Sequence, residues 1–292
     1  YTLASYDTDD GSPGSAQLLL AFGADGTPRW ERTFRISPLS STRPMSIAVD
    51  RVTGNIYTTG SNFLRGDSSV VTIAYDAQGR LLWSEQLPGQ RGVAIAVDPA
   101  SGHVVVGGYA PDGELLTLAY DPDGQLQWSV TEPGTEGSTF VDLAVDPRTG
   151  TVIQTGYDNP EPIGRRNDYV TRAYDLTGQP LWTRIYNGVG DRSDRPGALV
   201  LDSRRGVVYV TGTSDRDSYL SSHTDVTTVA YDLAGNLLRV DRYASRYHFN
   251  YGEDIAVDPR DGSVHVAGTV YTQAGLNSGA LALSYPTAAP AG

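Results

Sequence analysis

A short phrase recurs along this chain at nearly constant spacing and constrains its fold more than any other feature. Each complete copy is an alanine, an aromatic ring and then an aspartate or glycine, followed eight residues after the ring by tryptophan or, once, arginine. The copies run from Ala21 to Trp30, Ala74 to Trp83, Ala119 to Trp128, Ala173 to Trp182 and Ala230 to Arg239, and a sixth begins at Ser284. A repeat of about fifty residues running from end to end predicts one small unit copied six times. We therefore expect a single domain over residues 1–286 and a loose tail over 287–292.

Each unit contains four short runs bounded by turn residues. In the second unit these are Ile47–Asp50, Asn55–Thr58, Val70–Tyr75 and Arg80–Trp83. The runs are rich in Val, Ile, Thr and Tyr and show no sustained 3.6-residue period, which predicts strands rather than helices. Turns such as Asp98–Gly102 separate them, because a tight hairpin needs a positive φ that glycine adopts without strain. The aspartates of these turns are expected to be turn formers first.

Four-stranded antiparallel units of this length cannot each bury both faces alone, so they must stack on one another. Radial stacking into a β-propeller protects most strand edges, and the recurrent tyrosine and tryptophan would fill the wedge between blades. The sequence thus predicts an all-β propeller of six four-stranded blades whose first and last repeats are incomplete. The first unit opens at its second strand and the last stops at its third. The two absent strands would be adjacent in a ring, so we expect the natural protein to extend upstream of Tyr1 and close the ring there.

The segment from Asp121 to Trp128, which ends its repeat, is similar to the ending of a PQQ-type propeller blade. The repeat as a whole resembles the SBBP-type (seven-bladed β-propeller) repeat proteins of bacteria, with looser similarity to NHL repeats. The resemblance covers virtually the whole chain and implies the propeller fold, but it names no activity. Six units are visible here where the family usually has seven, and a seventh upstream would restore that number.

Composition excludes several functions. The 292 residues include no cysteine, which removes disulfides, thiolate metal sites and cysteine nucleophiles. Lysine is absent too, so all 22 positive charges are arginine and no Schiff base can form. The net charge of −12 argues against a nucleic-acid partner, and no apolar run approaches the roughly 20 residues that membrane insertion requires. We expect a secreted or cell-surface protein.

The connections between strands fall into two sets. The turns from first to second and third to fourth strand are short and uniform, whereas the other connections vary in length and carry Tyr, Arg, Asp and His. Binding loops on a rigid scaffold have this character, and aromatic rings suit sugar faces or protein partners. The predicted binding residues are Tyr157, Arg165, Arg166, Asp168, His223, Tyr247, His248 and Tyr251. The alternative is that these loops are tolerated insertions whose aromatic rings pack beneath them.

A second candidate site lies at the mouth of the axial channel. Asp142 and Asp254 each precede the innermost strand of a unit, and Glu253 is adjacent to the second of them. Oxygen ligands of this kind suit Ca²⁺, although such carboxylates also serve as acceptors for backbone N–H groups. The four histidines are too dispersed for a three-histidine zinc site, and no catalytic or cofactor-binding motif is present.

These observations favour a non-catalytic binding module that recognises a protein or a glycan through its variable loops. One alternative is an extracellular hydrolase or lyase that uses Asp142, Glu253, Asp254 and His248 at the channel mouth as acid, base or metal ligands. Another is a structural module of a longer surface or filament protein, since both ends of the chain look cut.

Overall fold

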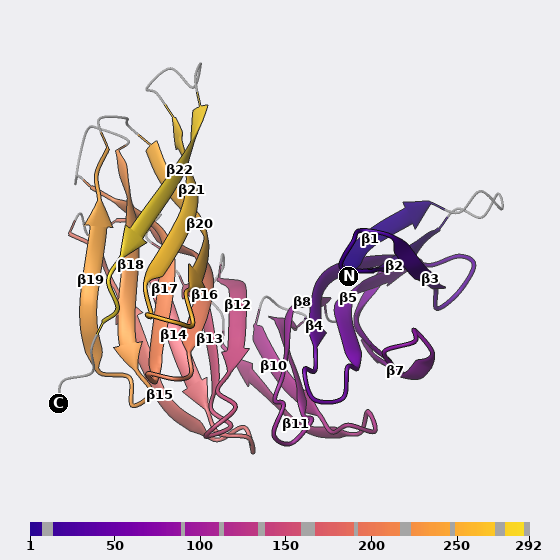
Figure 1. Ribbon diagram of the computed structural model, residues 1–292. Coiled ribbons are helices and arrows are strands. Elements are labelled where there is room, and N and C mark those ends of the chain that lie inside the picture. Colours follow the sequence, from indigo (N-terminus) through magenta and orange to yellow (C-terminus); the bar gives the residue numbers. More distant parts are fainter. Residues whose placement is uncertain are drawn as a thin grey trace. The chain divides into compact units, whose positions relative to one another are not determined.

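A computed structural model describes residues 1–7, 14–88, 91–110, 114–133, 138–158, 167–189, 192–216, 223–245, 249–271 and 278–288. These residues form 22 strands in six antiparallel sheets, and none of them is helical (Figure 1). The all-β prediction is confirmed. Accordingly, the described part of the chain offers no helix with the length and apolar character needed to cross a bilayer.

The chain divides into two compact units, Tyr1–Pro133 and Gly134–Gly292. The first unit holds three sheets: β1 (Thr2–Asp7), β2 (Ser15–Phe22) and β3 (Pro28–Phe34); β4 (Ser41–Val49), β5 (Ile56–Leu64), β6 (Asp67–Tyr75) and β7 (Leu81–Pro88); and β8 (Arg91–Val97), β9 (Val104–Tyr109), β10 (Leu115–Tyr120) and β11 (Leu126–Glu132). The single domain expected over residues 1–286 stays a prediction.

The second unit holds the other three sheets. They are β12 (Thr139–Val145), β13 (Val152–Asp158), β14 (Asp168–Tyr174) and β15 (Pro180–Tyr186); β16 (Asp194–Asp202), β17 (Val207–Asp215), β18 (Thr224–Asp232) and β19 (Leu237–Tyr243); and β20 (Phe249–Val257), β21 (Val264–Tyr271) and β22 (Ser278–Tyr285). The first and last of the six sheets have three strands and the others have four, as the repeat predicts.

The short turns repeat one hydrogen-bond pattern. In the turn after β8, the Asp98 N–H donates to the His103 carbonyl at 2.9 Å and the Gly102 N–H donates to the Asp98 carbonyl at 2.7 Å. The Asp98 carboxylate accepts from the Ala100 N–H and the Ser101 hydroxyl, and Gly102 has a φ of 75°. The turns after β4, β12, β16 and β20 repeat the bond from the glycine N–H to the aspartate carbonyl, so these aspartates do form the turns.

Tryptophan side chains fill the space between neighbouring sheets within each unit. Trp83 of β7 lies between Tyr57 of its own sheet and Tyr120 of the next, with ring centroids 6.0 and 5.7 Å away. Its indole N–H donates to the Pro122 carbonyl in the next sheet at 2.8 Å. In the second unit Trp182 makes the equivalent bond to the Leu233 carbonyl at 2.9 Å. The predicted wedge role of these rings is confirmed for both.

Each of these rings rests on a glycine of the next sheet. A Cβ on Gly124 would lie 2.8 Å from the Trp83 ring, and a Cβ on Gly235 would lie 2.7 Å from the Trp182 ring. Both glycines also have positive φ, so the same residue makes the turn and admits the tryptophan. At the last pair of sheets Arg239 replaces tryptophan and donates to the Pro286 carbonyl at 2.7 Å. In the described sheet β20–β22 no fourth strand follows, so no turn glycine is there to receive an indole.

The first strand of five of the six sheets begins earlier than the sequence predicts. In β4, β8, β12, β16 and β20 the pairing continues past a β-bulge of one extra residue. The partner strand carries a glycine opposite each bulge: Gly60, Gly108, Gly156, Gly212 and Gly268. A Cβ on any of these glycines would lie within 2.2 Å of a backbone carbonyl oxygen, so only glycine admits the bulged strand. Asp142 and Asp254 therefore lie inside strands rather than in the loops that precede them.

The start of the expected C-terminal tail is fixed. The Ala288 N–H donates to the Tyr209 hydroxyl at 2.9 Å, and the Ala288 side chain is buried. The expectation of a loose tail is thus wrong for Thr287 and Ala288, because this buried hydroxyl holds them. Residues 289–292 lie outside the described residues.

Because a tryptophan rests on one turn glycine and not on another, replacement of each glycine by alanine should lower the free energy of unfolding by different amounts. Gly26 and Gly235 have the same φ of 80°, but no atom lies within 4 Å of a Cβ placed on Gly26. Gly26→Ala should cost about 1–2 kcal/mol from backbone strain alone. Gly235→Ala should cost about 1–3 kcal/mol more, because Trp182 must move. Denaturant unfolding measures both.

A Trp182→Ala background provides the control. There the excess cost of Gly235→Ala over Gly26→Ala should disappear, since the displaced ring is gone. Equal costs of the two glycine substitutions in the otherwise unchanged protein would contradict the proposed role of the indole.

Candidate functional site

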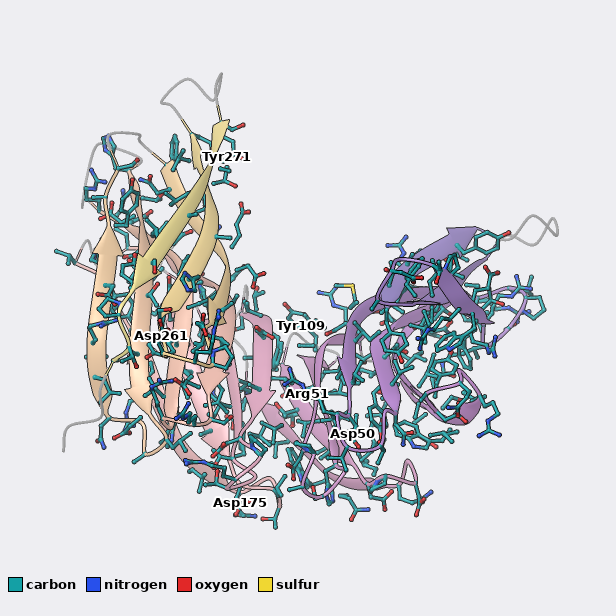
Figure 2. The ribbon with its side chains drawn as sticks, in the orientation of Figure 1. Asp50, Arg51, Tyr109, Asp175, Asp261 and Tyr271 are labelled. Atoms are coloured by element: carbon teal, nitrogen blue, oxygen red, sulfur yellow. The ribbon has the colours of Figure 1, made fainter. Side chains whose placement is uncertain are left out.

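A cavity of about 720 Å³ lies in the second unit between the sheets β16–β19 and β20–β22. It opens where the strands run into the variable loops, at the end that carries Tyr271 and opposite the turn end marked by Asp175 (Figure 2). The lining residues are Arg192, Ser193, Arg195, Pro196, Gly197, Thr213, Asp215, Thr224, Phe249, Tyr251, Gly252 and Glu253. Among the predicted binding residues, Tyr251 lines this cavity.

The β-bulges place the main lining residues. Arg195 and Tyr251 occupy equivalent positions in β16 and β20, just before the bulge of each strand. Their carbonyl oxygens lie 2.2 and 2.0 Å from where Cβ atoms of Gly212 and Gly268 would stand. The extra residue of the second bulge is Glu253, which also lines the cavity. A bulge changes the direction in which side chains point, and here it brings these side chains to the cavity wall.

Arg195 is held from behind by two other elements. When the side-chain amide of Asn167 turns its oxygen toward Arg195, that oxygen accepts from Arg195 Nε at 2.9 Å and from Nη2 at 3.0 Å. The guanidinium also lies over the Tyr157 ring, 5.6 Å from its centroid. Tyr157 thus supports a lining residue of the cavity, and Asp168 is a buried residue next to Asn167. The structure brings Tyr157, Asp168 and Tyr251 to one end of the second unit.

Three aromatic rings form one wall. Phe249 and Tyr251 alternate along β20, and Tyr271 of β21 packs edge-on against Tyr251 with centroids 5.7 Å apart. A second hollow of about 420 Å³ adjoins the cavity and is lined by Phe249, Tyr251, Glu253 and Tyr271. Burial raises the pKa of Tyr251, with Tyr271 and Asp215 adding to the shift and Arg195 opposing it. The phenol therefore stays neutral and can donate a hydrogen bond.

Two carboxylates complete the lining. Burial raises the pKa of Asp215, while the Ser193 N–H, Arg192 and Arg195 oppose the shift. Its backbone N–H donates to the Ser193 carbonyl at 3.1 Å, which fixes the strand end. Glu253 accepts a hydrogen bond from the Thr269 hydroxyl at 2.7 Å. Both carboxylates thus have fixed positions at the cavity.

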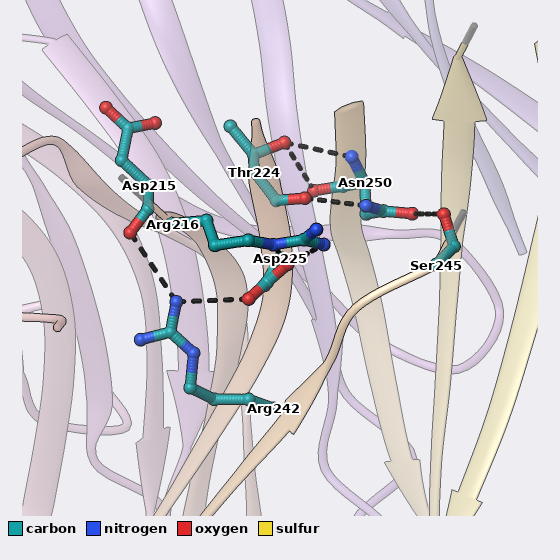
Figure 3. A network of polar contacts seen from close by, with 7 residues as sticks. All are labelled: Asp215, Arg216, Thr224, Asp225, Arg242, Ser245 and Asn250. Atoms are coloured by element: carbon teal, nitrogen blue, oxygen red, sulfur yellow. Dashed lines mark hydrogen bonds and ion pairs between the residues drawn. The ribbon is translucent and has the colours of Figure 1, made fainter. Parts of the chain in front are cut away.

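A half-buried network of polar contacts joins strands that line the cavity to their neighbours (Figure 3). Asp225 accepts from Arg216 Nε at 2.8 Å and from Arg242 at 3.2 Å, and the same Arg242 nitrogen donates to the Asp215 carbonyl at 3.5 Å. The buried Asp225 carboxylate is paired with both guanidinium groups, and polar networks connected in this way favour one arrangement. The network therefore ties β17, β18 and β19 together beneath Asp215.

Asn250 links the two sheets that form the cavity. Its side-chain amide donates to the Thr224 carbonyl at 2.6 Å, and its backbone N–H donates to the Thr224 hydroxyl at 2.9 Å (Figure 3). Ser245 donates to the Asn250 side-chain oxygen. His223, a predicted binding residue, stands just before Thr224, and its carbonyl accepts from the Arg216 N–H at 2.9 Å. It does not line the cavity.

The predicted metal ligands act as local acceptors. Asp142 accepts from the Leu143 N–H at 2.8 Å and from the Leu199 N–H of the neighbouring sheet at 3.0 Å, and burial raises its pKa. Asp254 accepts from the Ile255 N–H at 2.8 Å. Across the part of the chain that the structure describes, no three His, Asp or Glu side chains assemble into a group that could hold a metal ion. These contacts match the backbone-acceptor alternative to Ca²⁺.

Arg165, Arg166, Tyr247 and His248 lie outside the described residues. Arg192 and Arg195, which line the cavity, are not among the residues predicted from the sequence. A signal for Arg195 was present, because the same repeat position holds arginine in Arg43 and Arg91. Each of these two also lies over an aromatic ring, at 5.3 and 4.5 Å from the centroid.

Comparison with known proteins supports the fold. No family model matches the sequence, and the curated proteins contain no match. Among solved structures, the chain is similar to the GH74 enzyme of Niastella koreensis, with a TM-score of 0.51, 16% identity and coverage of 82% of this chain and 36% of that one. It is also similar to a D477G ACO/RPE65 chimera, with a TM-score of 0.52, 13% identity and coverage of 90% of this chain and 66% of that one. A Trp149Ala mutant of Synechocystis apocarotenoid oxygenase matches with a TM-score of 0.50, 11% identity and coverage of 94% of this chain and 69% of that one. These enzymes are β-propeller-like, so the chain has a β-propeller-like all-β fold.

A buried carboxylate near the cavity predicts a pH dependence of stability. Asp194 at the start of β16 is 1% exposed, and its Oδ2 accepts from the Gly188 N–H at 2.6 Å. Burial raises its pKa to about 6, with Asp168 adding to the shift. The folded state therefore holds this proton more tightly than the unfolded state, and the group destabilises the fold as the pH rises from about 4 to about 6.

Replacement of Asp194 by asparagine should remove this contribution. At pH 7 the Asp194→Asn protein should be more stable by up to about 3 kcal/mol, and the difference should vanish near pH 4. Urea unfolding of both proteins across that range measures it. A difference that does not change with pH would contradict the assignment.

Proposed function

We propose that this chain is a secreted or cell-surface binding module, built as a β-propeller of six blades, that recognises a carbohydrate through the cavity between β16–β19 and β20–β22. The observation that supports the proposal is the lining of the cavity. Aromatic rings, fixed charged groups and hydroxyls meet in a concave site at the loop end of the second unit. Sugar rings present apolar C–H faces and hydroxyl edges, which need this combination of partners.

The location of the cavity supports the same proposal. It lies where the variable connections attach, whereas the opposite end of the unit consists of uniform turns that hydrogen-bond to themselves. The walls are held by the Asp225 and Asn250 networks, so a ligand meets a preformed surface and binding costs little ordering of side chains.

Replacement of Tyr251 by alanine tests the proposal. Tyr251→Ala should weaken binding to a retained polysaccharide by about tenfold or more, because it removes the central ring of the wall. Affinity electrophoresis in gels that contain the polysaccharide measures the change. Tyr109→Ala in the first unit is the matched control, since Tyr109 is also a half-buried strand tyrosine but does not line the cavity. Unchanged retention of Tyr251→Ala would place the site elsewhere.

One observation favours a second candidate, a glycan hydrolase acting at the same cavity. Asp215 and Glu253 both line it, and the pKa of Asp215 is raised by burial. Glycoside hydrolysis uses a pair of carboxyl groups of which one stays protonated as the acid.

Release of reducing ends from the retained polysaccharide distinguishes the two candidates. A hydrolase should lose this release by at least about a hundredfold in Asp215→Asn and in Glu253→Gln. A binding module should release none with any variant. Asp254→Asn, which alters a carboxylate outside the cavity lining, serves as the control.

A further inference from the structure

We infer that the ligand of this cavity is a neutral oligosaccharide of at least two sugar residues, whose hydroxyls bridge Arg195 and Asp215 while a sugar ring stacks on Tyr251. The inference rests on the proposed function and specifies its ligand. Three features of the described lining support it: the balance of charge, the gap between the paired charges, and the extent of the aromatic wall.

Among the described residues that line the cavity, the charges cancel. Arg192 and Arg195 contribute two positive charges, and Asp215 and Glu253 contribute two negative charges. The protein as a whole carries −12, which repels anions at long range. An acidic polysaccharide would need an excess of positive charge in the site to overcome this repulsion, and a cationic ligand would meet two guanidinium groups. The balance therefore favours an uncharged ligand.

Arg195 and Asp215 are close without forming a direct contact. Both side chains line the same cavity, where Arg195 opposes the rise in the pKa of Asp215, and among the described residues no ion pair joins the two. The guanidinium is held by Asn167 and Tyr157, and Asp215 is held by Ser193, so neither side chain is arranged to close the gap. A hydroxyl both donates and accepts hydrogen bonds, so it can accept from Arg195 and donate to Asp215 at once. A pair of neighbouring hydroxyls on a sugar satisfies both groups.

The aromatic wall extends beyond one sugar ring. Phe249, Tyr251 and Glu253 line both the main cavity and the adjoining hollow, so the two are continuous. Tyr271 extends the wall into the hollow by its edge-on contact with Tyr251. A ligand that fills both has one ring in each, which makes it an oligosaccharide or an internal stretch of a polysaccharide.

Affinity electrophoresis of the full chain tests this ligand class. The gels contain neutral hydroxyethylcellulose, xyloglucan, dextran or galactomannan, or acidic alginate or polygalacturonate. At least one neutral polymer should retard the protein, with a dissociation constant unchanged between about 0.1 and 1 M salt, since no net charge is paired. The acidic polymers should not retard it.

Variants of Arg195 and Asp215 test the bridging. Arg195→Ala and Asp215→Ala should each raise the dissociation constant for the retained neutral polymer about tenfold or more, and the double variant should be little worse than either. Arg91→Ala is the matched control, because Arg91 holds the same repeat position and also lies over a tyrosine. Arg195→Lys gives a second measurement if alanine prevents folding, because it keeps the charge and loses the planar group.

The outcomes separate the inference from the proposed function. Retention by acidic polymers alone would overturn the neutral ligand while leaving carbohydrate binding intact. Retention by neither class would overturn the proposed function and the inference with it. Full retention of the Arg195 and Asp215 variants by a neutral polymer would overturn the bridging role of this pair.

Discussion

The packing of a tryptophan on a turn glycine of the next sheet is the contact on which the arrangement within each unit depends. Trp83 and Trp182 each bury an indole against the neighbouring sheet and donate to a carbonyl of its turn. A four-stranded sheet has two apolar faces and cannot bury them by itself, so its neighbours must supply the cover. The hydrophobic clusters accordingly combine residues of two sheets, as with Tyr57 and Tyr120 around Trp83. A larger residue than glycine would push the sheets apart.

The cavity follows from the same repeat, with a different glycine. The strands β4, β8, β12, β16 and β20 each carry a bulge that only a glycine in the partner strand can admit, and the residue before the bulge stands at the loop end of its sheet. That residue is Arg195 in β16 and Tyr251 in β20. The regular scaffold thus fixes where the side chain stands, while its chemistry varies from one sheet to the next. A ligand site between two such sheets needs no irregular backbone beyond the bulge.

The all-β class and the antiparallel sheets were predictable from the sequence because their signals are local and repeated. The spacing from Tyr75 to Trp83 and the turn from Asp98 to Gly102 each fix one element, and repetition removes the ambiguity of any single copy. The bulges were missed because their signal is split between two strands. Gly212 alone looks like an ordinary strand glycine, and its meaning depends on its pairing with Pro196.

The site was less predictable than the fold. Tyr251 was predicted because aromatic residues cluster near it, and it lines the cavity. Asp142 and Asp254 were predicted as metal ligands, and their oxygens accept backbone N–H groups. Arg195 was missed because its role depends on Asn167 and Tyr157, which lie far from it in sequence. Which of many charged residues converge on one cavity is decided by tertiary structure, and a single sequence without its pairing register does not contain that information.

Hydrogen–deuterium exchange with and without a bound neutral oligosaccharide tests the central claim most directly, because it reports where the ligand lies without any substitution. We expect slower exchange at the start of β16, the end of β17 and the start of β20, with no change in the turns that follow Asp202 and Asp258. Protection confined to those turns, or to strands of the first unit, would contradict it.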